Sequence, residues 1–128
     1  SLAVMMLISE VFNVFYYAAA ASGGSVAPSA LVAVTANTLM GRIEENLEKA
    51  LAAKRVHNGG FLDLTYYEQG LDAATIDNLT KWGHRLSPAP AIGLVNAVFC
   101  STGIPVKEEA SCSMRNDPRG FGLASGAE

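Results

Sequence analysis

Hydrophobic positions along the chain first form one nearly unbroken run. Leu2 to Ala21 are apolar except for Ser9, Glu10 and Asn13. About 20 apolar residues approach the length of a membrane-spanning helix. However, Glu10 would lie near its middle, where an unpaired charge costs on the order of 3 kcal/mol on insertion scales. We therefore predict an apolar helix over residues 1–21 that packs among other helices, and we leave membrane contact open.

Residues 22–28 contain Gly23, Gly24 and Pro28, and this composition predicts a flexible break in the chain. Hydrophobic positions then recur every three to five residues, which predicts an amphipathic helix over residues 29–56 with Ser29 as N-cap. Those positions are Leu31, Val34, Leu39, Ile43, Leu47 and Leu51. The Asn58-Gly59-Gly60 segment supplies the stop signal for this helix.

Residues 60–128 predict a small mixed head. Phe61 to Tyr67 indicates a short strand or an extended arm. Asp72 is a candidate N-cap for a short helix over residues 72–86. Ala91 to Phe99 fits a buried strand or a helix, and a loop follows Cys100, with Phe121 and Leu123 on one side of a short terminal strand. The fold class predicted for the single domain 1–128 is α+β and helix-rich.

Composition adds a constraint on the surface. Half of the residues are hydrophobic and 16% are charged, whereas soluble domains typically carry about 25% charged residues. Much of the surface is therefore expected to be apolar or covered by partners. The net charge of −3 and the lack of a basic run disfavour nucleic-acid binding.

Candidate chemistry is sparse. His57 and His84 have no Cys, His, Asp or Glu at the third or fourth following position, as a helical zinc motif requires. Asn58-Gly59-Gly60 lacks the Lys-Ser/Thr of a phosphate-binding loop. We therefore predict no catalytic, cofactor or metal site. The alternative is a site made by folding, in which Cys100, His57 or His84, and Asp63 come together.

The two cysteines, Cys100 and Cys112, leave two interpretations. In an oxidising compartment they would pair and close the intervening loop, which stabilises a fold by about 3 kcal/mol on chain-entropy estimates. Otherwise they are free thiols, and Cys100 is a candidate nucleophile. We favour the disulfide.

The order of parts resembles a type IV pilin: an apolar N-terminal helical half, a break at Gly23, Gly24 and Pro28, an amphipathic second half and a globular head. The segment from Cys100 to Cys112 resembles the C-terminal disulfide loop of that family, although Met5 occupies the position of its acidic residue. The resemblance implies a surface filament subunit without catalysis. Its self-association residues would lie on the first helix: Leu2, Val4, Leu7, Val11, Phe12 and Phe15.

These observations lead to a non-enzymatic structural or interaction protein. It would form a homo-oligomer through the N-terminal helix at the cell surface or outside the cell. Two alternatives stay open. One is a small cytoplasmic α+β enzyme or ligand-binding domain, and the other is one subunit of an obligate hetero-oligomer.

Overall fold

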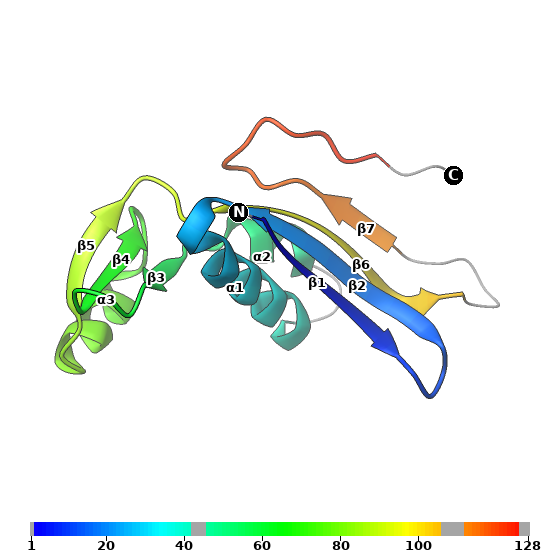
Figure 1. Cartoon of the computed structure of the whole chain (residues 1–128), viewed down its shortest axis with the longest axis horizontal. Helices are drawn as coiled ribbons and strands as arrows, with labels where there is room; N and C mark the ends of the chain where they lie inside the picture. The colour runs from blue at the N-terminus through cyan, green and yellow to red at the C-terminus, as the bar shows by residue number, and fades with distance from the viewer. Residues whose placement is uncertain (1, 42–45, 106–111, 126–128) are drawn as a thin grey trace.

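The computed structural model describes residues 2–41, 46–105 and 112–125 of the 128-residue chain. Two sheets dominate it (Figure 1). The four-stranded sheet is antiparallel in the order β1-β2-β6-β7: β1 (Leu2–Ser9), β2 (Val14–Ser22), β6 (Leu94–Ile104) and β7 (Cys112–Arg115). The three-stranded sheet has the order β3-β4-β5: β3 (Val56–Asn58), β4 (Leu64–Glu68) and β5 (Arg85–Ala89). The helices are α1 (Ala27–Met40), α2 (Asn46–Ala52) and α3 (Ala73–Lys81), and a 3-10 turn, Gly24–Val26, precedes α1.

The N-terminal segment is a β-hairpin, so the apolar helix predicted over residues 1–21 is wrong. Side chains of β1 alternate between an exposed face, which carries Val4 and Met6, and a face packed on the core, which carries Met5 and Leu7. Because both faces are apolar, the period of two that identifies a half-buried strand is absent from the hydropathy pattern. The polar residues inside the run mark the hairpin turn, where Asn13 adopts a φ of 50°.

The amphipathic stretch 29–56 contains two helices rather than one. Helix α1 begins at Ala27, with Pro28 in its first turn, and ends at Met40 before Gly41. Helix α2 ends at Ala52, four residues before β3 begins, so Gly59 and Gly60 lie in the β3–β4 turn rather than at a helix end. The predicted position Ile43 lies outside the described residues. No helix in the described ranges is both long and apolar enough to span a membrane.

The rest of the predicted head is only partly as expected. The N-cap at Asp72 is confirmed, because its carboxylate accepts the Thr75 N–H at 2.8 Å, but α3 ends at Lys81. The segment predicted as a strand or a helix over Ala91 to Phe99 belongs to a strand, β6, which begins at Leu94. Phe121, predicted on a short terminal strand, is exposed and lies outside any strand. With two sheets and short helices, the helix-rich class with a long N-terminal helical region is wrong.

The core lies between the four-stranded sheet and the helices α1 and α2. Its centre brings Tyr17 and Val95 of the sheet against Leu31, Val34 and buried alanines of the helices and sheet. Small alanine side chains in β2 allow α1 to approach the sheet closely. The Tyr17 hydroxyl bonds with the Thr35 hydroxyl across this layer at 3.1 Å, and burial raises the pKa of Tyr17.

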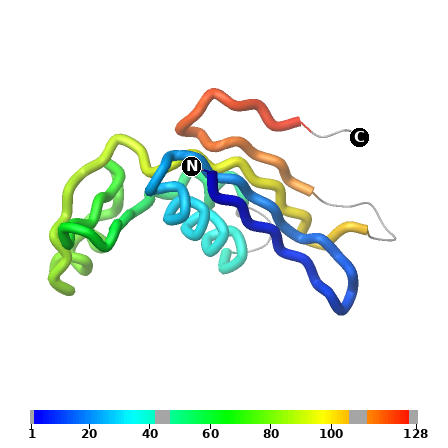
Figure 2. The backbone as a smooth tube through the Cα atoms, in the orientation of Figure 1, coloured from blue at the N-terminus to red at the C-terminus, as the bar shows by residue number. Residues whose placement is uncertain are grey.

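The segment after β7 turns back and runs alongside that strand (Figure 2). The turn contains Asp117, whose side chain is buried, and Arg119. Thus a segment close to the end of the chain is anchored beside the start of β6, where Asp117 accepts the Val95 N–H at 2.8 Å.

Candidate functional site

The cysteines form a disulfide. Cys100 of β6 and Cys112 of β7 face each other in the antiparallel register and are covalently joined. The thiol of Cys100 is therefore unavailable as a nucleophile, which removes the proposed grouping with His57, His84 and Asp63.

Replacing both Cys100 and Cys112 with Ser is expected to lower the free energy of unfolding by about 3 kcal/mol, because the bridge restricts the unfolded chain. Urea unfolding in the absence of reductant measures the difference. Adding reductant should shift the wild-type midpoint to that of the double variant and leave the variant unchanged. Equal unfolding midpoints for the wild type and the double variant in the absence of reductant would show that the disulfide does not stabilise the fold.

The two histidines have structural neighbours. The His57 ring bonds with the Ser29 hydroxyl at 2.7 Å and joins β3 to the first turn of α1, while His84 lies 3.5 Å from the Thr65 hydroxyl. Within the described residues, no carboxylate is hydrogen-bonded to either ring, so the Ser29–His57 pair lacks the orienting acid of a catalytic triad. Asp63 lies in the β3–β4 turn at a φ of 46°. The described ranges also contain no group of three or more His, Cys, Asp or Glu placed to hold a metal ion.

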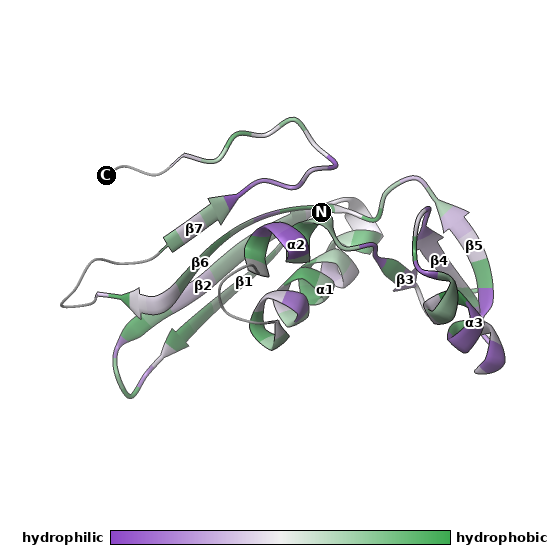
Figure 3. Cartoon of the chain, turned by 180° about the vertical axis from the view of Figure 1, so that it is seen from behind, coloured by the Kyte–Doolittle hydropathy of each residue, from purple (hydrophilic) through white to green (hydrophobic). Residues whose placement is uncertain are grey.

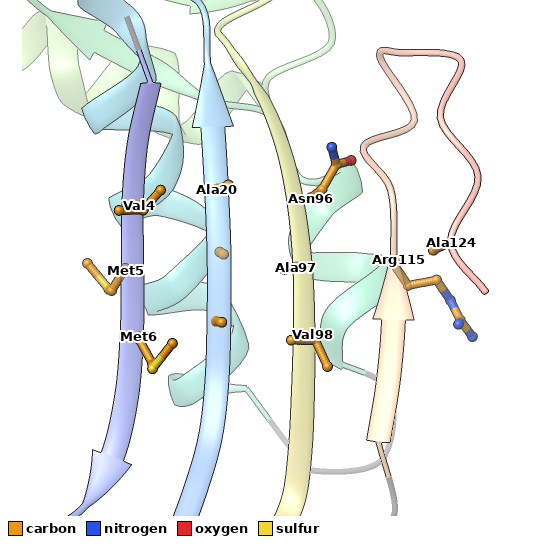
Figure 4. Close-up of a pocket in the computed structure, with 11 residues that line it drawn as sticks. Val4, Met5, Met6, Ala20, Asn96, Ala97, Val98, Arg115 and Ala124 are labelled. Atoms are coloured by element: carbon orange, nitrogen blue, oxygen red, sulfur yellow. The ribbon is translucent and has the colours of Figure 1, made fainter. Parts of the chain in front are cut away.

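The outer face of the four-stranded sheet, opposite α1 and α2, is apolar and open. It carries a shallow groove of about 530 Å³ (Figure 4). Ala18 and Ala20 of β2 form its low floor, and larger side chains such as Met6 and Val98 lie on the neighbouring strands. Asn96 and Arg115 are its polar residues. Such a surface fits an apolar contact better than acid-base chemistry.

The residues predicted for self-association do not share one surface. Leu2 and Val4 are exposed on the outer sheet face, and Figure 3 colours β1 mainly as hydrophobic. Leu7 packs against the core instead, while Val11 and Phe12 are exposed in the hairpin turn. Phe15 is half-buried in β2. Self-association itself stays a prediction, now without the helix on which it was based.

The turn between β2 and α1 contains two adjacent glycines with positive φ angles. Gly23 and Gly24 have φ angles of 131° and 64°, which L-residues with side chains rarely adopt. This double-glycine turn (Gly23 and Gly24) leads through Ser25 into α1, and Gly23 and Ser25 are exposed. From the sequence alone, these glycines predicted only a flexible break in the chain.

Electrostatics at this point favour negative charge. Helix α1 has 14 residues and no acidic side chain in its first turn, and its N-cap residue, Val26, makes no side-chain capping bond. A helix N-terminus of this kind presents backbone N–H groups and the positive end of the helix dipole. The double-glycine turn can therefore stabilise a carboxylate, or an oxygen that becomes negative during a reaction.

A network of charged side chains is bound to Gly93, which is a neighbour of Gly23 in this turn. We call its members the buried quartet: Arg55, Glu68 and Asp117, which are buried, and Arg119, whose side chain is 12% exposed. Arg55 donates to Asp117 Oδ2 at 2.6 Å, and Arg119 donates to Glu68 Oε1 at 2.6 Å. Arg119 also bonds with Asp117 Oδ1 at 3.1 Å. The two arginines and two carboxylates balance in charge.

Burial opposes ionisation of both acids in the quartet. For Glu68, hydrogen bonds from Arg119 and from the Ile92 and Arg55 amides outweigh burial and hold its pKa below the ordinary value. For Asp117, burial is likewise outweighed by the Arg119 amide, Arg55 and the Val95 amide, which lowers its pKa. The pKa of Arg119 is raised, because the two carboxylates overcome the effect of its burial. All three groups are therefore charged at neutral pH.

The sequence and the fold of this chain are similar to those of known proteins. A gamma-glutamyltranspeptidase family profile matches residues 1–127. The chain belongs to the gamma-glutamyltranspeptidase family. A comparison of this chain with curated protein sequences found no match.

Solved structures of gamma-glutamyltranspeptidases share this fold. The Helicobacter pylori enzyme, as its T380A mutant, superimposes with a TM-score of 0.78 and 26% identity over 94% of this chain. The Pseudomonas nitroreducens enzyme complexed with L-DON gives 0.78 and 23% over the whole chain, and the Bacillus anthracis transpeptidase CapD gives 0.72 and 15% over 98%. This chain covers 61%, 63% and 70% of those three chains, respectively.

Family membership corrects two predictions. The pilin resemblance is wrong, because the chain matches another family and has a β-hairpin where the pilin layout requires a long N-terminal helix. The prediction of a non-enzymatic structural protein is also contradicted, and the alternative of an enzyme agrees better with the family. For location, the disulfide is compatible with a compartment outside the cytoplasm.

Proposed function

We propose that this chain is part of an enzyme that transfers γ-glutamyl groups, and that its double-glycine turn stabilises the oxyanion formed in that reaction. The family match over residues 1–127 is the observation that carries the proposal. The exposed turn at the uncapped start of α1 supports it, because the turn offers hydrogen-bond donors suited to a developing negative charge.

The chemistry is acyl transfer. A nucleophile adds to the γ-carbonyl carbon of the donor, and the electron pair of the C=O bond moves to the oxygen. This oxyanion then re-forms the carbonyl as the amine leaves with a proton, and a second amine or water later takes the acyl group. The proposal assigns to this chain the stabilisation of the oxyanion through the backbone of Gly24 and Ser25. It assigns no nucleophile.

We also propose that the outer face of the four-stranded sheet packs against further polypeptide of the complete enzyme. Leu2, Val4, Met6 and Ile8 are 60–79% exposed on this face, an apolar surface of the kind that marks a protein contact. This chain covers only 61% of the matched chain of the Helicobacter pylori enzyme, so relatives possess additional polypeptide that can provide such a cover. Contact between two copies through this face is the alternative.

The disulfide further supports an extracellular or cell-surface location.

The proposed activity is tested with the complete protein and two chromogenic anilides, one joined through the γ-carboxyl of glutamate and the other through the α-carboxyl. We expect arylamine release from the γ-linked donor only, and a faster release when a dipeptide is added as acceptor. Equal release from both donors, or none from the γ-linked one, would contradict the proposal.

A further inference from the structure

The buried quartet also holds the beginning of β6 and the loop before it. Arg55 donates through Nη1 to the carbonyl oxygens of Ile92 at 3.1 Å and Gly93 at 3.0 Å. Glu68 accepts the Ile92 N–H at 2.8 Å, and Asp117 accepts the Val95 N–H at the same distance. Four backbone groups within residues 92–95 are therefore bound to three charged side chains, which are buried themselves.

Gly93 in turn lies directly against the double-glycine turn. A Cβ on Gly93 would come within 2.7 Å of Ala30 Cβ in α1 and 3.2 Å of the Ser22 carbonyl oxygen. A Cβ on Gly23 would approach Gly93 Cα to 3.0 Å. The Gly93 backbone thus fills a slot formed by the end of β2 and the first turns of α1, and any shift of Gly93 is transmitted to them.

We propose that the buried quartet is a positioning device for the double-glycine turn and acts on it through Gly93. Its guanidinium groups have fixed planar donor geometry, which suits them to hold four carbonyl oxygens and two carboxylates in one arrangement. The carbonyl oxygens belong to Leu51, Ala53, Ile92 and Gly93. The four side chains come from three separated segments of the chain, and they fix the turn without touching it. The importance of this positioning for catalysis rests on the proposed function, whereas the mechanical coupling does not.

The coupling is tested by hydrogen exchange on the complete protein, with Arg55→Lys and Gly93→Ala as variants. Lysine retains the charge of Arg55 but cannot reproduce its several directed bonds. Both variants should raise amide exchange in residues 22–30 by at least about tenfold, and Arg55→Lys also in residues 92–95. Gly60→Ala is the matched control, because Gly60 has a φ of 71° against 69° for Gly93 but nothing within 4 Å of its Cβ position.

The consequence for catalysis is measured on the same variants. A displacement of about 1 Å at a reacting group can cost about 10²-fold in rate. We expect kcat for the γ-linked anilide to fall about 10- to 100-fold in Gly93→Ala, with little change in KM. Adding Ala30→Gly, which removes the methyl group in the slot, should restore part of both the rate and the exchange protection.

The outcomes separate the two proposals. Unchanged exchange in residues 22–30 of folded Gly93→Ala and Arg55→Lys proteins would overturn the positioning role, whatever the activity. Raised exchange with wild-type kcat would overturn its catalytic importance. Raised exchange in a protein without γ-glutamyl activity would retain the coupling and reject the proposed function. If Gly93→Ala does not fold, amide exchange and kcat are compared with wild type in the Arg55→Lys protein and in the Gly93→Ala/Ala30→Gly protein instead.

Discussion

Asp117→Ala is expected to lower the free energy of unfolding by about 3–5 kcal/mol, the largest stability effect expected among our substitutions. Removing one partner of a buried ion pair leaves the other charge without compensation. Here the partner is Arg55, whose side chain is 1% exposed and bonds with Asp117 at 2.6 Å. The Val95 amide would lose its acceptor as well. Chemical denaturation of the purified protein measures the effect.

Asp77→Ala provides the control, because Asp77 is exposed on α3. It should change the free energy of unfolding by no more than about 0.5 kcal/mol. The double variant Arg55→Met/Asp117→Ala should be more stable than the sum of the single effects predicts, since neither charge is then left alone. A loss below about 1 kcal/mol for Asp117→Ala would show that the quartet does not stabilise the fold.

Acid should destabilise the protein through the same carboxylates. The pKa values of Glu68 and Asp117 are lowered in the folded protein, whereas in an unfolded chain they are about 4.3 and 3.9. A lowered folded-state pKa means that this stabilisation is complete above the unfolded-state pKa values and is lost as the pH falls through the folded-state values. The loss should be comparable to that in Asp117→Ala, because protonation also leaves Arg55 unpaired.

Urea unfolding between pH 7 and pH 2 measures this dependence. The wild-type free energy of unfolding should decline below about pH 4, and the Asp117→Asn variant should start lower and decline less steeply. Parallel pH profiles for the two proteins would mean that Asp117 does not contribute to acid sensitivity.

Local signals in the sequence predicted some elements well. Asp72 was recognisable as an N-cap because its capping bond reaches only three residues along the chain, to Thr75. The β1–β2 hairpin was not recognisable, because Met5 and Leu7 face the core while Val4 and Met6 lie on an outer face that is equally apolar. A strand that is apolar on both faces has the hydropathy pattern of a buried helix.

The candidate site could not be predicted from local pattern because its contacts are distant in sequence. Arg55 and Asp117 are 62 positions apart, and Arg119 and Glu68 are 51 apart. The amphipathic helix predicted over residues 29–56 includes Arg55, although helix α2 ends at Ala52. A signal was present in the double glycine before Pro28, since adjacent glycines before a helix also occur where a backbone binds an anion.

The kcat of the Gly24→Ala protein shows whether the double-glycine turn stabilises the oxyanion. Gly24 has a φ of 64° and nothing within 4 Å of its Cβ position, so the substitution distorts the proposed oxyanion site without a clash. We expect a fall in kcat of about 10²-fold, with KM nearly unchanged and Gly60→Ala retaining the wild-type rate. A kcat within about twofold of wild type in folded Gly24→Ala protein would contradict it.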